Sequence, residues 1–288
     1  MFNRSASLAV VVTCACALPL GAQAPPAADA DAPPALLVVY RETVKVGRSA
    51  AHEVNEQGWA AVMSKAQWPT GWLGTTAMTG ASEAWYFTGY PTWEAFGSDI
   101  AAQATADSLA DAGKHRAADG ELVHATHEMI ARYRPALSYK PLGNLAHMRY
   151  FTIDTVRVKP GHDAAFADQW REIVAAHEKA NVDEHWAVYA VQAGAPTGTY
   201  LFIYARKSLG ELDAAGPAHT SDAYRDAMGE AGRARNRDVF RQVIESDETN
   251  HFAFSPKMSY VPKSWVDADP AFWTPPSPPA ATTARKKP

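Results

Sequence analysis

Cysteine is almost absent from this chain of 288 residues: the sequence holds only Cys14 and Cys16, both near its start. If that start is a cleaved leader, the mature protein has no cysteine, which excludes disulfides, thiol nucleophiles and cysteine metal ligands. Basic charge is also scarce, since 27 basic residues face 31 acidic ones for a net charge of −4. A surface without excess basic charge cannot neutralise a phosphate backbone, so no nucleic-acid partner is expected.

Long apolar runs and familiar enzyme motifs are missing as well. No segment approaches the roughly 20 consecutive apolar residues that cross a bilayer, so no permanent transmembrane helix is predicted. The sequence has no P-loop, no G-x-G-x-x-G, no G-x-S-x-G and no H-E-x-x-H pattern. These absences exclude the common nucleotide-binding and hydrolase classes, while a hydrophobic content of 47% predicts a folded protein.

The first 24 residues have the pattern of a secretory signal peptide. Arg4 precedes an apolar stretch over residues 8–20, and a small-x-small cleavage pattern ends at Ala24. We therefore expect an exported protein, located in the periplasm or outside the cell after cleavage near Ala24. A lipoprotein acylated at Cys14 or Cys16 is the alternative, which the threonine before Cys14 disfavours.

Proline- and alanine-rich segments flank the part that is expected to fold. Residues 25–34 are predicted to be a Pro/Ala spacer, and residues 263–288 a Pro-rich disordered tail, most clearly from Pro275 onward. Segments of this composition bury too little apolar surface to offset the entropy lost on ordering.

An internal repeat with an offset of about 114 residues organises the rest of the chain. Matches occur in the same order in both copies, which indicates a duplication into units 35–142 and 145–262. The main matches are Val44–Ala51 with Val156–Ala165, Trp72 with Trp186, Gly80 with Gly194, and Trp85–Phe87 with Tyr200–Phe202.

Both copies show the same succession of strand and helix signals. Gly47 and Gly161 end the first strand of each copy, and alanine-rich amphipathic segments follow. The predicted elements are first strands at 36–46 and 148–158, helices at 48–67 and 163–181, hairpins at 72–89 and 186–206, helical stretches at 91–133 and 208–250, and last strands at 136–140 and 252–260.

This β-α-β-β-α-β order is the split βαβ arrangement of a ferredoxin-like sandwich, which makes the predicted fold class α+β. Two such units in one chain can bury their open sheet faces against each other as an intramolecular pseudo-dimeric α/β barrel. The chain thus resembles the dimeric α/β-barrel superfamily, which includes antibiotic-biosynthesis-type monooxygenases, NIPSNAP-like proteins and chlorite-dismutase-like haem proteins. The duplication implies a monomer, with higher oligomers still possible.

The first helix of copy one carries polar residues where copy two carries large apolar ones. His52, Glu56 and Trp59 align with Phe166, Trp170 and Ile173. Members of the resembled superfamily commonly bind ligands between helices and sheet, so we predict a pocket in the first copy. Alternatively the helix is rotated, burying Val54, Ala61 and Val62 and exposing His52 and Glu56. The predicted pocket is lined by His52, Glu56, Trp59, Trp72, Trp85 and Phe87.

Further polar residues are secondary candidates. His177 and His185 could offer an imidazole to a ligand, although a buried histidine is more often held by a backbone carbonyl. Glu42 and Asp154 occupy matching places in the first strands, where pairing with Arg41, Arg149 and Arg157 in a structural network is the alternative. His124 and His127, at i and i+3 of a predicted helix, are weak metal-ligand candidates.

Taken together, these features predict an exported protein that binds a small apolar or aromatic molecule in the pocket of the first copy. The resemblance permits the alternative of a cofactor-independent monooxygenase-like or haem-dependent enzyme. No cofactor is predicted, and haem enters only with that alternative, as a group that His177 or His185 would have to ligate.

Overall fold

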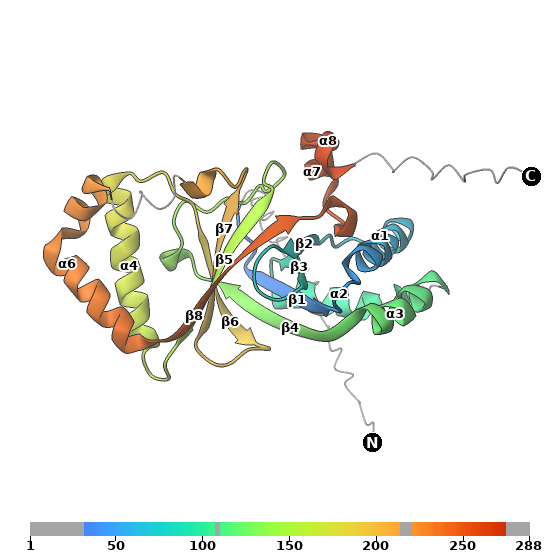
Figure 1. The fold of residues 1–288 in the computed structure, drawn as a ribbon, viewed down its shortest axis with the longest axis horizontal. Coiled ribbons are helices and arrows are strands. Elements are labelled where there is room, and N and C mark those ends of the chain that lie inside the picture. The colour runs from blue at the N-terminus through green and yellow to red at the C-terminus, as the bar shows by residue number, and fades with distance from the viewer. Residues whose placement is uncertain (1–31, 107–109, 214–220, 275–288) are drawn as a thin grey trace, which may run out of the picture.

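Eight antiparallel strands form a closed barrel in the computed structural model, which describes residues 32–106, 110–213 and 221–274. Around the barrel the strand order is β1-β3-β2-β8-β5-β7-β6-β4. The helices lie on two opposite sides of it, with α1–α3 on one side and α4 and α6 on the other (Figure 1). The fold is therefore α+β, with the sheet at the centre and the helices outside.

The first half of the chain contributes four strands and three helices. Strand β1 and helix α1 meet at Gly47, whose positive φ of 78° suits glycine. Helix α3 runs directly into β4 without a loop. The elements are β1 (Leu36–Val44), α1 (Ser49–Lys65), β2 (Leu73–Ala77), β3 (Glu83–Tyr90), α2 (Trp93–Ala106), α3 (Ala110–Leu122), β4 (Val123–Tyr133) and the 3-10 turn η1 (Pro135–Leu137).

Over its described residues, the second half follows the same element order, and the kinked helix α6 precedes its last strand. Helix α4 ends at Asn181, which takes the left-handed conformation of a C-cap, and α6 kinks at Gly229. The elements are β5 (Tyr150–Val158), α4 (Asp163–Ala180), β6 (Ala187–Ala193), β7 (Thr199–Arg206), α6 (Asp222–Val243), β8 (Ile244–Phe254), η2 (Pro256–Met258), α7 (Lys263–Ala268) and α8 (Pro270–Trp273).

Two strand pairs join the halves and close the barrel. Strand β2 pairs with β8, where Thr75 lies opposite Phe254, and β4 pairs with β6, where Arg132 lies opposite Ala190. Because closure pairs every strand on both sides, the sheet has no free edge.

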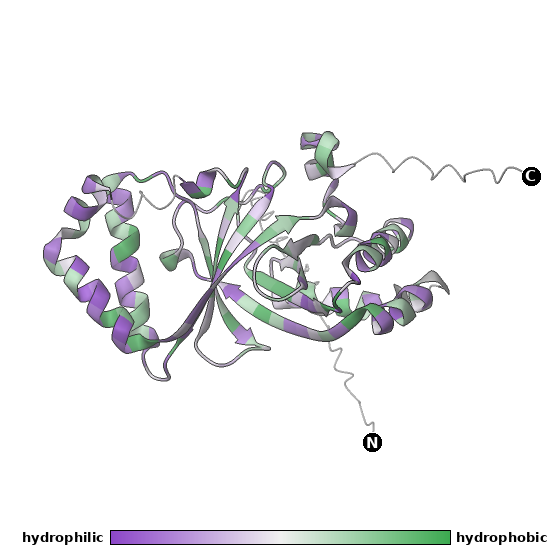
Figure 2. Cartoon of the chain, viewed as in Figure 1, coloured by the Kyte–Doolittle hydropathy of each residue, from purple (hydrophilic) through white to green (hydrophobic). Residues whose placement is uncertain are grey.

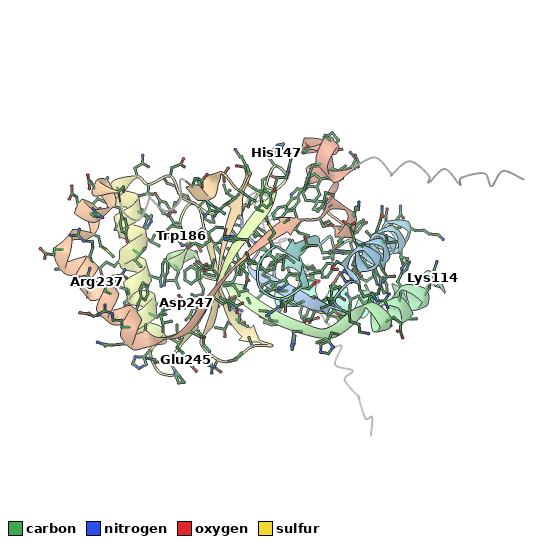
Figure 3. The ribbon with its side chains drawn as sticks, viewed as in Figure 1. Lys114, His147, Trp186, Arg237, Glu245 and Asp247 are labelled. Atoms are coloured by element: carbon green, nitrogen blue, oxygen red, sulfur yellow. The ribbon has the colours of Figure 1, made fainter. Side chains whose placement is uncertain are left out.

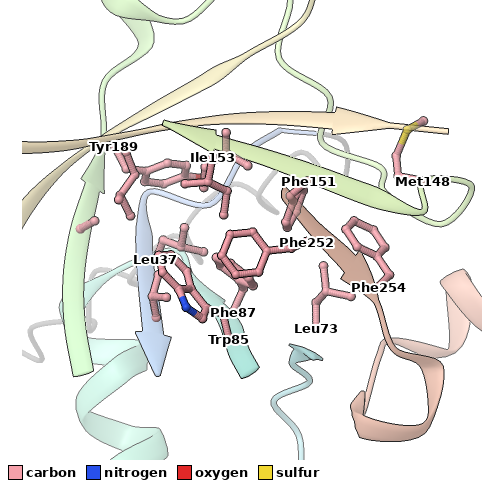
Figure 4. Close-up of a cluster of buried hydrophobic side chains, with 14 of the residues drawn as sticks. Leu37, Leu73, Trp85, Phe87, Met148, Phe151, Ile153, Tyr189, Phe252 and Phe254 are labelled. Atoms are coloured by element: carbon pink, nitrogen blue, oxygen red, sulfur yellow. The ribbon is translucent and has the colours of Figure 1, made fainter. Parts of the chain in front are cut away.

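Alternate residues of the strands fill the barrel interior with aromatic and aliphatic side chains (Figure 4). Phe87 and Phe151 meet edge to face with ring centroids 5.3 Å apart, a favourable arrangement. Hydrophobic stretches follow the barrel strands, whereas helix α6 is mostly hydrophilic (Figure 2). The interior set includes Leu37, Val39, Trp85, Phe87, Phe151, Ile153, Leu201, Ile203, Phe252 and Phe254.

The last strand of each half begins earlier than the sequence predicts. Strand β4 covers 123–133 and β8 covers 244–254, whereas strands were predicted at 136–140 and 252–260. The prediction of helix through residue 133 was wrong because the alternating segment V-H-A-T-H-E-M-I-A-R-Y follows the helix without a Gly or Pro break. Tyr139 and Tyr260 make only single bridges, to Trp186 and Trp72.

The predicted tail from residue 263 is also corrected in part. Residues 263–273 form the short helices α7 and α8 instead of a disordered segment. Trp273 is buried and donates its indole N–H to the carbonyl of Ala146 at 2.9 Å, and Asp269 pairs with Arg149. The remainder of that tail, residues 275–288, and the predicted leader over 1–24 lie outside the described residues.

Within the described parts of the chain, none of the helices combines the length and the apolar character that crossing a membrane requires.

Candidate functional site

A buried polar cluster lies between α1 and the sheet, formed by Glu42 of β1 and by His52 and Glu56 of α1. The Nε2 atom of His52 is 2.7 Å from Glu42 Oε2 and 4.0 Å from Glu56 Oε1. The side chains of Glu42, His52 and Glu56 are 5%, 3% and 9% exposed. Their ligand atoms all lie within 4.8 Å of one another, so one imidazole and two carboxylates face a common point.

Burial strongly changes the acidity of this cluster. Loss of hydration raises the pKa of Glu56 to about 9, and the negative charges of Glu42 and Asp119 act in the same direction. The neighbouring Tyr86 acts on the pKa of Glu56 in the opposite direction, although its hydroxyl makes no hydrogen bond of standard geometry. Burial, followed by Glu56 and Glu42, raises the pKa of Tyr86 itself well above its usual value.

A hydrogen-bonded layer between α1 and α3 supports the cluster. Asn55 donates to Asp119 Oδ1 at 2.5 Å, and its Oδ1 lies 2.8 Å from His115 Nδ1. The indole of Trp59 donates to Asp119 Oδ2 at 2.9 Å. Asp119 therefore fixes two residues of α1, which holds the helix face carrying His52 and Glu56 against the sheet.

The barrel contains a cavity of about 500 Å³ at one end, which we call the barrel-end cavity. Its floor consists of interior side chains from several strands, and its rim is formed by the loops before β1, β2 and β5 and by α7. Floor residues are Leu37, Leu73, Phe87, Phe151 and Ile203, and rim residues include Trp72, Leu142 and Trp265.

The polar groups of this cavity are few and neutral in kind. Thr70 and Tyr90 both donate to the buried Asp99, at 2.5 Å and 2.8 Å. Burial and this contact with Asp99 raise the pKa of Tyr90. Burial also raises the pKa of Tyr189, which lines the cavity. No Asp, Glu, Lys or Arg lines the cavity among the described residues.

The structure divides the six residues of the predicted pocket among different places. His52 and Glu56 lie in the buried polar cluster, beside the layer that Trp59 joins. Trp72 and Phe87 line the barrel-end cavity. Trp85 lies in the barrel interior under Arg41 and donates to Glu83.

The expectation of one pocket containing all six residues was therefore wrong, because the sheet separates them. Side chains alternate along β3, so Trp85 and Phe87 point into the barrel while Tyr86 points toward α1. The alternative of a rotated helix does not hold either, since His52 and Glu56 are buried while Val54 is 68% exposed.

The same region of the second half is filled with aromatic side chains. Phe166 and Trp170 of α4 pack on Phe202 and Trp186, with the Trp170 and Phe202 centroids 4.4 Å apart. Figure 3 places Trp186 between the strands and α4. The alignment of Trp85–Phe87 with Tyr200–Phe202 that the sequence suggested was wrong.

Strand pairing gives the corrected correspondence. Ala84 lies opposite Glu42, and Phe202 lies opposite Asp154, so Phe202 corresponds to Ala84.

His177 lies in the aromatic core of the second half. It is fully buried, its Nδ1 lies 2.8 Å from the carbonyl of Ile173, and its Nε2 lies 3.4 Å from Glu184. His185 is more exposed: its Nδ1 lies 2.7 Å from the carbonyl of Lys140, and it lines the barrel-end cavity.

Haem, which the superfamily resemblance permits, does not fit these residues. The ring of His177 packs against Trp186 at 4.8 Å and Tyr139 at 5.4 Å, and both of its nitrogens face protein groups. Asp183 lies 3.4 Å from the Nε2 of His185.

Asp154 and the first-strand arginines do not form the predicted shared network. Thr249 donates to Asp154 at 2.7 Å, and burial raises the pKa of this carboxyl. The three arginines pair elsewhere, Arg41 with Glu83, Arg149 with Asp269 and Arg157 with Glu245.

His124 and His127 lie on strand β4, not on a helix, and both are exposed. The i, i+3 spacing that places two side chains together on a helix does not do so on a strand. Among the described residues, the group of His and carboxylate side chains that meets metal-ligand distances is Glu42, His52 and Glu56 instead.

Sequence reasoning missed Tyr86, Asn55, Asp119 and Asp99. Tyr86 had a detectable signal, because it alternates with the interior residues Trp85 and Phe87 and therefore faces the helices. Asn55 and Asp119 had no such signal, since their contact joins residues 64 positions apart.

The similarity of this chain to known proteins lies in its fold. No protein-family profile matches the chain, and no curated protein matches its sequence. A protein of Fusobacterium nucleatum described as a proposed monooxygenase is similar over 77% of this chain and 93% of its own, with a TM-score of 0.51 and 12% identity. A proposed monooxygenase of Lactobacillus acidophilus covers 76% and 93%, with a TM-score of 0.48 and 7% identity.

A mutant chlorite dismutase of Candidatus Nitrospira defluvii is similar over 82% of this chain and 96% of its own, with a TM-score of 0.44 and 8% identity. At such low sequence identities, structural similarity indicates a shared fold and does not indicate a shared activity. Combined with the closed eight-stranded barrel, the first of these comparisons shows that the chain has the dimeric α/β-barrel fold.

Proposed function

We propose that this protein binds a small apolar or aromatic molecule in the barrel-end cavity. The observation that carries the proposal is the cavity itself, about 500 Å³ in volume with a floor of Leu37, Phe87, Phe151 and Ile203. Volumes of roughly 300–1,000 Å³ with mainly apolar walls are typical of small-molecule sites. The site differs from the helix–sheet pocket that the sequence suggested.

The chemistry of the lining indicates a neutral ligand. With no Asp, Glu, Lys or Arg among the described lining residues, a charged molecule would lose its hydration without gaining a counter-ion. Tyr90, Tyr189 and His185 offer hydrogen-bonding groups at or near the wall. A ligand with an aromatic or aliphatic body and one or two hydroxyl or carbonyl groups suits this arrangement.

A fluorescence titration with the neutral probe N-phenyl-1-naphthylamine tests the proposal. Ala205 lines the cavity, so Ala205→Phe is expected to fill part of it and to weaken binding at least about tenfold, which is about 1.4 kcal/mol. The matched control Ala101→Phe lies on the exposed face of α2 and should bind as the original chain does. Equal binding by both variants, each with an unchanged circular dichroism spectrum, would refute the site.

We also propose that the barrel consists of two tandem ferredoxin-like units, 35–142 and 145–262. In support, the strand order within the first half is β4-β1-β3-β2, and within the second half it is β8-β5-β7-β6. Co-expressed fragments 35–142 and 145–274 should then assemble one to one. Failure to co-purify, with both fragments soluble, would count against independent units.

Export is a further part of the proposal, resting on the leader-like residues 1–24. The intact mass of protein recovered from the periplasm of an expressing bacterium should correspond to a chain beginning near Pro25. A mass that includes the leader would contradict it, and a mass increased by acyl chains would indicate the lipoprotein alternative.

A second candidate function is a cofactor-independent monooxygenase-like enzyme, favoured by the buried polar cluster of Glu42, His52 and Glu56. Burying an ionisable group lowers the free energy of unfolding. Such groups are therefore found most often where a function requires them. Oxygen uptake with aromatic quinols that is lost in His52→Gln would support this candidate. Absence of uptake, together with binding of the neutral probe, would leave the binding function alone.

A further inference from the structure

We propose that Glu42, His52 and Glu56 bind one divalent transition-metal ion between α1 and β1. The proposal concerns the helix side of the sheet, is independent of the barrel-end cavity, and is an alternative to the cofactor-independent enzyme considered above for the same residues. All three side chains belong to well-defined elements, β1 and α1, and His52 and Glu56 lie one helical turn apart.

The distances among the three ligand atoms suit a metal ion after small adjustments. With metal–ligand bonds of about 2.0–2.2 Å, neighbouring ligand atoms lie roughly 3–3.5 Å apart. The distance from His52 Nε2 is 2.7 Å to Glu42 Oε2 and 4.0 Å to Glu56 Oε1. Widening the first and shortening the second by about half an ångström brings both into that range.

Two buried oxygens in this place have no hydrogen-bond partner. They are Glu56 Oε1, on a side chain more than nine-tenths buried, and the hydroxyl of Tyr86. Buried polar atoms without partners are costly and uncommon. An ion bound by Glu56, with a water that reaches Tyr86, would supply both partners.

The charge around the cluster favours a cation. Glu42 and Glu56 face a single imidazole, so an ion that displaces the proton held by Glu56 would meet two carboxylates and one neutral ring. Two neighbouring basic side chains form contacts outside the cluster. Arg41 pairs with Glu83, and Lys45 donates to backbone carbonyls at the end of α3.

The donor set indicates which metals would bind. One imidazole nitrogen with two carboxylates is a mixed nitrogen and oxygen set, which suits Zn²⁺, Mn²⁺ or Fe²⁺ better than Cu⁺, which prefers sulfur, or Ca²⁺, which prefers oxygen. Co²⁺ is a spectroscopic substitute for these ions. The second half has Phe166 and Trp170 where the first has His52 and Glu56, so we expect one site per chain.

The test uses the full chain, first treated with chelator and then incubated at length with Co²⁺ or Zn²⁺ alone, because the site is enclosed. We expect one equivalent of Co²⁺ with a visible d–d spectrum and a concentration-dependent rise in melting temperature with Zn²⁺. Glu56→Gln keeps the size of the side chain and should weaken binding at least about tenfold.

Two control variants separate this site from other acidic groups. Glu53→Gln removes a carboxylate from the same helix, where Glu53 pairs with Lys257, and should leave binding unchanged. Asp154→Asn changes the matching strand position of the second half and should also have no effect. Binding of equal strength in Glu56→Gln, or no stoichiometric binding by the original chain, would overturn the proposal.

Discussion

The two halves of this barrel have the same element order but opposite interfaces between helix and sheet. In the first half, α1 presents His52 and Glu56 to Glu42 of the strand below. In the second half, α4 presents Phe166 and Trp170 to an aromatic core. One arrangement of strands and helices therefore accommodates either a polar or an apolar interface.

The difference between the two interfaces bears on the stability of each half. Fully burying a large apolar side chain contributes about 1.5–3 kcal/mol, so the aromatic interface stabilises the second half. Burying two carboxylates and an imidazole costs free energy unless they are paired. Glu42 and His52 are paired, whereas Glu56 Oε1 has no hydrogen-bond partner, and this is the arrangement that the metal site proposed above for the first half requires.

The largest expected effect comes from opening the apolar interface. Phe166 is fully buried among Trp170, Tyr200 and Phe202. Phe166→Ala should lower the free energy of unfolding by about 3–5 kcal/mol, because it removes apolar contact and leaves a cavity. Urea denaturation measures the change, with Val54→Ala on the exposed face of α1 as a control expected to cost under about 0.5 kcal/mol.

A somewhat smaller loss is expected from breaking the polar interface at one position. His52→Phe leaves Glu42 buried without its partner and should cost about 3 kcal/mol. The triple variant Glu42→Leu, His52→Phe, Glu56→Leu removes all three polar groups and should regain most of this loss. If the triple variant is less stable than His52→Phe, burial of the polar groups carries no net cost.

A pair of Tyr→Phe variants compares single hydroxyls of the two halves. Tyr139 lies against the carbonyls of His177 and Val182, at 3.1 Å and 2.9 Å, so Tyr139→Phe should cost about 1–2 kcal/mol. The hydroxyl of Tyr86 has no hydrogen-bond partner in the structure, so Tyr86→Phe should be neutral or slightly stabilising. Thermal melts after chelator treatment measure both, and equal losses would contradict the comparison.

The smallest effect is a dependence on pH at Asp154. Burial raises its pKa, so the folded state holds the proton more tightly than the unfolded state does. The stabilisation from this group is full below the unfolded pKa of about 3.9 and is lost as pH rises through the folded value. Asp154→Asn should therefore gain roughly 0.5 kcal/mol at pH 7 and nothing near pH 3, in melts across that range.

Local signals in the sequence predicted most elements of the fold. The glycines after each first strand and the alanine-rich helices placed β1, α1, β5 and α4 within a few residues. The boundary between α3 and β4 could not be predicted in this way, because no Gly or Pro separates them. Tertiary pairing of β4 with β1 and β6 decides that boundary.

The candidate site was predictable only in part. The polar contrast of His52 and Glu56 with Phe166 and Trp170 is visible in the sequence, and the structure buries both polar residues. Which face of β3 meets them depends on strand register, where a shift of one residue exchanges the two faces. Trp85 and Phe87 were therefore assigned to the wrong side of the sheet.

A double-mutant cycle between Glu42 and His52 tests the central claim that a paired polar cluster is buried in the first half. Unfolding free energies of Glu42→Gln, His52→Gln and the double variant give the coupling between the two side chains. A buried pair at 2.7 Å should yield a coupling of at least about 1 kcal/mol. The corresponding cycle with Asp154→Asn and Phe166→Leu should give nearly none, and a coupling near zero for Glu42 and His52 would contradict the account.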